Sequence, residues 1–166
     1  MTSAQSPGEP IPVFRLPAST GHTLELDSFK DKVPLILLFL QPGSPRSDDL
    51  LGAVDGRLRE FGAERSQILV VMRLTARETR ALADERGLAV PVLADASGSM
   101  ARDFEVIDEA ERPVAVIADK SGRLIRRFDP LSEADDPEEV VDALLYAVRA
   151  IGTGALIPED RDSSKP

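Results

Sequence analysis

The sequence predicts an α/β protein with a mixed central β-sheet, helices on both faces of the sheet and an N-terminal β-hairpin. Two continuous apolar runs, residues 33–40 and 67–72, have the composition of strands that are covered on both faces. Segments with apolar residues at helical spacing alternate with these runs, and two strands with a short turn follow at residues 113–129. This order favours a sheet with both parallel and antiparallel neighbours.

The strands are predicted in chain order from apolar composition and turn residues. Residues 11–29 contain two short strands around a turn at residues 19–21, because residues 22–26 alternate between polar and apolar with a period of two. The two apolar runs form central strands. A short extended segment follows at residues 90–95, and the turn of the late hairpin lies at residues 119–122.

The two longer helices in the first half of the chain each begin with a start signal. In the helix at residues 47–64, Ser47 is predicted as the N-cap, and acidic residues follow it in the first turn. In the helix at residues 75–88, Thr75 and Glu78 have the spacing of a capping box. A helix is therefore expected to begin at each of these two signals.

Two more helices are expected in the second half of the chain. A short one is predicted at residues 99–106, after a Ser-Gly turn. The last covers residues 135–152, with Asp136 as its cap and Pro137 at its first helical position. Its valines and leucines recur at helical spacing and predict one buried face.

Length and charge limit the domain count and the partners. The chain has 166 residues, which predicts one domain, placed at residues 11–151 between a flexible N-terminus at 1–10 and a C-terminal tail at 152–166. The net charge is −9, and no basic run is longer than Arg126-Arg127. Nucleic-acid binding is therefore not expected.

The chain contains no cysteine, which excludes disulfides, thiolate chemistry and zinc–thiolate or iron–sulfur sites. The first residues do not have the basic and apolar regions of a secretory signal, and the longest apolar run is too short to cross a bilayer. We therefore expect a cytoplasmic protein without membrane contact, and we expect no cofactor.

Four segments together resemble the peroxiredoxins of the alkyl hydroperoxide reductase/thiol-specific antioxidant (AhpC/TSA) type. They are residues 12–40, 88–106, 113–128 and 135–148, in the order and spacing of that family. The resemblance implies a thioredoxin-like fold and an antioxidant peroxidase or thiol–disulfide oxidoreductase. It also implies a possible homodimer, because peroxiredoxins commonly dimerise.

The loop after the first central strand departs from this family. Peroxiredoxins carry a peroxidatic cysteine there, at the N-terminus of the next helix, and related members have Cys-Pro-x-Cys. This chain has Ser44-Pro45-Arg46-Ser47 at those four positions. A helix N-terminus lowers the pKa of a thiol, but a serine hydroxyl ionises too weakly and forms neither sulfenate nor disulfide. Thiol redox activity is therefore not expected.

A second departure concerns the segment before the late hairpin. Peroxiredoxins usually place an arginine there, and this chain has Pro113, with Arg112 beside it. Pro113 also resembles the proline that thioredoxin-like proteins hold in cis, facing the active loop. The sequence leaves the isomer of Pro113 open. By resemblance, a groove beside the loop and Pro113 is a candidate site for an extended peptide.

The residues of this loop also allow roles other than redox chemistry. Ser47 as a hydrolytic nucleophile would need a base, and the only histidine, His22, lies in an early turn. Arg46, Ser47 and Arg112 are candidate ligands of a small anion at the helix N-terminus. Asp48 and its neighbours match no calcium-loop spacing, so we expect no metal site.

Three interpretations of function follow from these residues. The first is a thiol-redox-inactive peroxiredoxin-like domain that serves as a binding, structural or regulatory module. The second is a non-thiol enzyme that uses an anion site at Arg46. The third is an ordinary thiol peroxidase or oxidoreductase in which serine has replaced the natural cysteines at Ser44 and Ser47. The native gene sequence at these two codons distinguishes the third from the others.

Overall fold

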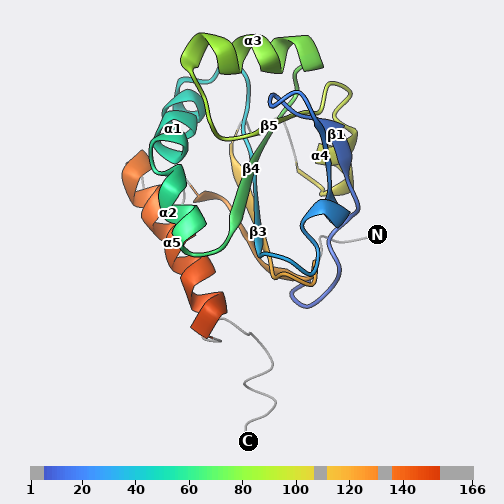
Figure 1. The fold of residues 1–166 in the computed structure, drawn as a ribbon, viewed down its shortest axis with the longest axis vertical. Helices are drawn as coiled ribbons and strands as arrows, with labels where there is room; N and C mark the ends of the chain where they lie inside the picture. Colours follow the sequence, from blue (N-terminus) through green and yellow to red (C-terminus); the bar gives the residue numbers. More distant parts are fainter. Residues whose placement is uncertain (1–5, 107–111, 131–135, 154–166) are drawn as a thin grey trace, which may run out of the picture.

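A computed structural model describes residues 6–106, 112–130 and 136–153 of the chain (Figure 1). Its central sheet has five strands in the order β5-β4-β3-β6-β7. The strands are β3 (Leu35–Phe39), β4 (Gln67–Met72), β5 (Val92–Ala94), β6 (Val114–Ala118) and β7 (Leu124–Phe128). Strands β3, β4 and β5 are parallel, and β6 is antiparallel to both β3 and β7. The predicted mixed sheet is therefore confirmed.

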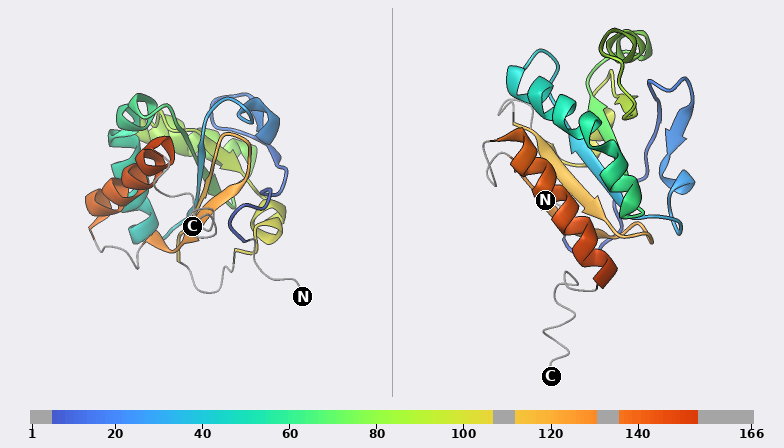
Figure 2. Two further views of the ribbon diagram at one scale, coloured as in Figure 1. Left: turned by 90° about the horizontal axis from the view of Figure 1, so that it is seen from below. Right: turned by 60° about the vertical axis from the view of Figure 1, so that its left-hand side comes forward.

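Both faces of the sheet are covered, as Figure 2 shows from the side. Helices α1 (Pro45–Gly56), α2 (Leu58–Ala63) and α5 (Pro137–Thr153) pack on one face around one apolar cluster. The other face carries a second cluster that includes Phe14, Leu26 and Phe104. These residues belong to the N-terminal segment, to the short 3-10 helix η1 (Leu26–Ser28) and to the end of α4 (Ser99–Asp103).

The N-terminal hairpin is formed by β1 (Arg15–Pro17) and β2 (Thr23–Glu25), which pair antiparallel. Residues before it also pair with the rest of the fold. The N–H of Gly8 donates to the carbonyl of Leu124 at 2.7 Å, and the N–H of Ile11 donates to the carbonyl of Gly122 at 2.9 Å. These two bonds join the segment before β1 to the β6–β7 turn and to the start of β7.

Two of the predicted helix starts are confirmed. Helix α3 (Ala76–Arg86) begins with a complete capping box of Thr75 and Glu78. Helix α5 begins after Asp136, whose carboxylate accepts from the N–H of Glu138 at 3.1 Å. Both signals are local in sequence, which is why they could be identified without the tertiary structure.

The predicted start of the first long helix is wrong by one turn. Helix α1 begins at Pro45, and Ser44 is its N-cap, with extended backbone and a hydroxyl that accepts from the N–H of Ser47 at 3.3 Å. Proline is favoured at this position because its fixed φ suits the first turn and it has no N–H to leave unpaired. Ser47 is consequently the third residue of the helix, not its cap.

The helix predicted at residues 47–64 is also divided. Arg57 leaves the helical conformation, with φ −119° and ψ 21°, and separates α1 from α2.

Among the described residues, no helix is long and apolar enough to cross a membrane.

Candidate functional site

The Ser44–Ser47 loop lies at the carboxyl end of β3, where the chain turns into α1. Gly43 has a φ of +80°, a conformation that glycine adopts at little cost, and it directs the chain from the strand into the helix. Ser44 is half-buried, whereas Ser47 is only 1% exposed. The two serines that the resemblance aligns with cysteines therefore differ in their exposure.

The hydroxyl of Ser47 is bonded to Gln41 of its own loop. It accepts from the backbone N–H of Gln41 at 3.0 Å and donates to the side-chain oxygen of the same residue at 3.3 Å. Neither the backbone N–H nor the side-chain amide of Gln41 is a base that could remove the proton of the hydroxyl. Ser47 thus has the environment of a structural serine, not of an activated nucleophile.

Gln41 connects the loop to the start of β6, a role that the sequence analysis missed. Its side-chain amide donates to the carbonyl of Arg112 at 3.1 Å. The guanidinium of Arg112 in turn forms an ion pair with Asp129, beyond the end of β7. Pro113 follows in the chain and is buried, and the peptide bond before it is trans. The candidate residues Ser47, Arg112 and Pro113 are thereby brought to one end of the sheet.

The remaining candidates lie around the start of α1. Arg46 is exposed at the second position of the helix. Asp48 is half-buried, and its carboxylate forms an ion pair with Arg86 of α3 at 3.5 Å. His22 is exposed in the turn between β1 and β2, where its backbone N–H donates to the hydroxyl of Thr20. An anion site at Arg46 and Arg112 stays a prediction.

One buried carboxylate near β5 also has a structural explanation. Asp95 is 1% exposed, and its two oxygens accept from the N–H groups of Met100 and Ala101, each at 3.0 Å. It therefore satisfies the first N–H groups of α4. In the part of the chain that the structure describes, no group of three or more His, Asp or Glu residues is arranged to hold a metal ion.

A hollow beside the loop, here called the loop hollow, separates Pro42 and Gly43 from α3. Its volume is about 340 Å³. Its apolar lining includes Met72, Leu74 and Leu82, and its rim carries three carboxylates. These belong to Asp48, Glu78 and Glu85. The first is paired with Arg86 and the second closes the capping box. Apolar surface under an acidic rim suits a ligand with apolar and cationic groups.

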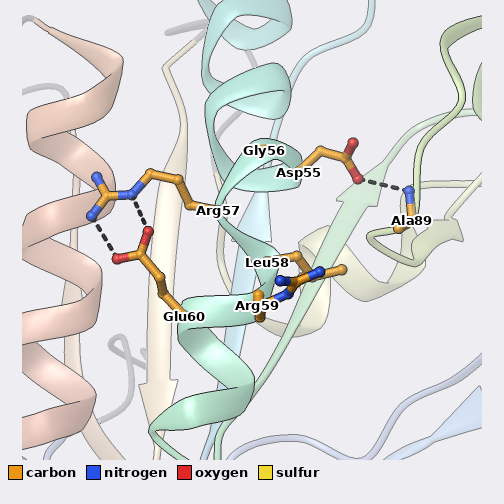
Figure 3. Close-up of a pocket in the computed structure, with 7 residues that line it drawn as sticks. All are labelled: Asp55, Gly56, Arg57, Leu58, Arg59, Glu60 and Ala89. Atoms are coloured by element: carbon orange, nitrogen blue, oxygen red, sulfur yellow. Dashed lines mark hydrogen bonds and ion pairs between the residues drawn. The ribbon is translucent and has the colours of Figure 1, made fainter.

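A second hollow, shown in Figure 3, surrounds the break between α1 and α2. Asp55 accepts there from the N–H of Ala89 at 2.7 Å, and Arg57 binds both oxygens of Glu60, each at 2.9 Å. Arg57 also contacts Asp142 of α5 at 2.8 Å. The hydrogen bonds to Glu60 and Asp142 raise the pKa of Arg57, and the bond from Arg57 lowers the pKa of Glu60. This arginine joins helices and is not an anion receptor.

Comparison with solved structures gives the fold. Peroxidoxin BcpB from Mycobacterium tuberculosis is 21% identical, with a TM-score of 0.76 over 89% of this chain and 98% of that chain. A cysteine-to-serine mutant of PrxQ from Xylella fastidiosa is 15% identical, with a TM-score of 0.77 over 91% and 99%. The reduced 2-Cys peroxiredoxin of Plasmodium vivax is 18% identical, with a TM-score of 0.74 over 89% and 96%. These likenesses support the thioredoxin-like fold.

Sequence comparison gives the family. No curated protein sequence matches the chain. The model of the AhpC/TSA family matches residues 7–128, which include β1 to β7, the Ser44–Ser47 loop and the buried Asp95. The match covers well over half of the 166 residues. The chain therefore belongs to the AhpC/TSA family.

Proposed function

We propose that this chain is a member of the AhpC/TSA family without thiol redox activity, and that it functions as a binding module. The observation that carries the proposal is the environment of Ser47. The position that by resemblance corresponds to a cysteine in the family is occupied here by a buried hydroxyl that forms two hydrogen bonds with Gln41. With no cysteine in the chain, no residue is available to form a sulfenate or a disulfide.

The loop hollow is the surface that we assign to the binding role. Of its three carboxylates, only that of Asp48 forms an ion pair with a described residue, and that of Glu78 is held in the capping box. The protein as a whole carries a charge of −9, which favours the approach of cationic ligands. We therefore propose an extended peptide with alternating apolar and basic residues as the ligand.

Titration with a designed peptide tests the binding role. An isotopically labelled protein is titrated with an extended peptide of alternating leucine and lysine, and backbone amide shifts are followed by NMR. We expect saturable shifts at Gly43, Leu74 and Leu82, and weaker binding by Glu85→Lys. A peptide with glutamate in place of lysine is the control. Equal binding of both peptides, or no shifts at the loop hollow, would overturn the assignment.

A peroxide-consumption assay with a dithiol reductant tests the other half of the proposal. The wild-type chain should consume peroxide no faster than the buffer. The native gene sequence provides an independent check, because cysteine codons at 44 or 47 would make the natural protein a thiol enzyme.

Three further expectations belong to this proposal. They are a domain that spans residues 11–151, a homodimer and a cytoplasmic location. Sedimentation equilibrium at several protein concentrations tests the homodimer, since a mass that stays at 17.9 kDa excludes it.

A further inference from the structure

A third hollow lies at the opposite end of the sheet from the Ser44–Ser47 loop and is called the basal hollow here. Its volume is about 560 Å³. Lys32 and Pro34 line it from just before β3, and Lys120 lines it from the turn after β6. Helix α5 contributes Val148 and Ile151. The volume falls within the range of small-molecule sites, which is about 300–1,000 Å³.

The floor of the basal hollow is apolar. Val148 is almost completely buried, and Ile151 and Pro34 are half-buried. All three side chains line the hollow. A ligand that covers Pro34 and Ile151 would remove apolar surface from water, which is the main source of affinity for small molecules.

The carboxylates of the basal hollow are already bonded within the protein. Glu64 accepts from the guanidinium of Arg149 at 2.9 Å. Asp119 accepts from the hydroxyl of Ser121 at 2.8 Å and from the N–H groups of Ser121 and Arg123, each at 3.0 Å. Asp119 thus stabilises the β6–β7 turn but keeps its charge, so the three cations and two carboxylates that line the hollow carry a net charge of +1.

Three cations remain at the rim, Lys32, Arg65 and Lys120. All are exposed, and none forms an ion pair with a carboxylate among the described residues. The chain as a whole has more acidic than basic residues, 29 against 20, whereas the lining of the basal hollow has more basic than acidic residues. All three residues line the same hollow, and the ammonium of Lys32 also donates to the carbonyl of Ser28 at 3.3 Å.

We propose that the basal hollow binds a small amphiphilic anion, with a carboxylate or phosphate head at the three cations and a short apolar body on Pro34, Val148 and Ile151. The apolar floor makes a purely ionic ligand insufficient. The rim makes a neutral apolar ligand a poorer match than a charged one. This inference does not depend on the proposed function, because the site lies at the other end of the sheet.

The test is an NMR titration of the full chain with four probes. Octanoate and octyl phosphate carry both features, octanol lacks the charge, and acetate lacks the apolar body. We expect saturable shifts of the Val148 and Ile151 methyl groups with octanoate or octyl phosphate, and the tighter of the two identifies the head group. Equal binding of octanol, or saturation by acetate alone, would overturn the proposal, as would the absence of shifts with every probe.

Charge-reversal variants establish where the anion binds. Lys120→Glu and Arg65→Glu should each raise the Kd of the bound probe about tenfold, because each replaces an attraction at the rim by a repulsion. Arg80→Glu makes the same change of net charge on α3, at the far end of the molecule (Figure 1), and should leave the Kd within about twofold. Equal effects of the rim and control variants would show that only net charge matters and would contradict a site here. Circular dichroism confirms that each variant is folded.

Discussion

Ser47 and Gln41 show how a single residue pair changes the character of the loop. The hydroxyl of Ser47 is buried, and its hydrogen bonds close a ring with the main chain and side chain of Gln41. The amide of Gln41 extends this ring to the carbonyl of Arg112. A group held in this way stabilises the loop and is not exposed to a substrate.

Replacement of Ser47 tests this structural role. Ser47→Ala leaves the partly buried N–H of Gln41 without its acceptor, so we expect the free energy of unfolding to fall by about 1 kcal/mol or more. Urea denaturation measures the change. Ser28→Ala is the control, since Ser28 is exposed, and it should stay within about 0.5 kcal/mol of the wild type. A neutral Ser47→Ala variant would contradict the role assigned to this hydroxyl.

The buried carboxylate of Asp95 leads to a second prediction. Asp95→Asn keeps one acceptor but turns an NH₂ group toward the N–H of Met100 or Ala101, so we expect a loss of about 2 kcal/mol in unfolding free energy. Ser97→Ala removes an exposed hydroxyl that accepts from Ser99 and should cost less than about 0.5 kcal/mol. Thermal denaturation compares the stability lost in the two variants. Equal losses would refute the interpretation that buried hydrogen bonds from Asp95 cap α4.

At the scale of elements, Arg57 joins the break between α1 and α2 to α5. Its guanidinium binds Glu60 of α2 and Asp142 of α5, and it also donates to the carbonyl of Glu138 at 3.1 Å. A second ion pair, Arg149 with Glu64, connects α5 to the end of α2. These contacts fix the three helices relative to one another above the same apolar cluster.

The Arg57–Glu60 pair predicts a dependence of stability on pH. The hydrogen bond from Arg57 lowers the pKa of Glu60 below its ordinary value of 4.5. A carboxyl group with a lowered folded pKa adds stability well above pH 4.5, and this stability is lost as the pH falls through the folded pKa. Glu60→Gln should therefore be less stable than the wild type near neutral pH and approach it in acid.

Urea denaturation between pH 3 and pH 7 measures this convergence. Glu85→Gln removes an exposed carboxyl group of α3 that forms no ion pair with a described residue, and its difference from the wild type should not converge in the same way. A constant difference between Glu60→Gln and the wild type at every pH would contradict the ion pair.

At the scale of the whole molecule, the sequence predicted the features that depend on local pattern. The buried runs of β3 and β4, the capping box of Thr75 and the order of elements all followed from periodicity and turn residues. The chain also carried enough family pattern to predict the fold. These signals need only neighbouring residues or known spacings.

The helix start at Pro45 was missed although Ser44-Pro45 has the same cap and proline pattern as Asp136-Pro137. Other details of the loop needed the tertiary structure. The role of Gln41 depends on Arg112, which is 71 positions away in the chain. No local pattern predicts such a contact. The same holds for the basal hollow, which is lined by Lys32, Arg65 and Lys120.

We attribute the absence of thiol redox activity to the serines at positions 44 and 47, since Ser44 caps α1 where a thiol would be activated. Peroxide consumption by the wild type, Ser44→Cys and Ser47→Cys, with a dithiol reductant, tests it most directly. A helix N-terminus lowers the pKa of a thiol at the N-cap of α1, whereas burial raises the pKa of a thiol at position 47. We expect no turnover by the wild type, turnover by Ser44→Cys, and little by Ser47→Cys. Turnover by the wild-type chain above the buffer rate would contradict this attribution.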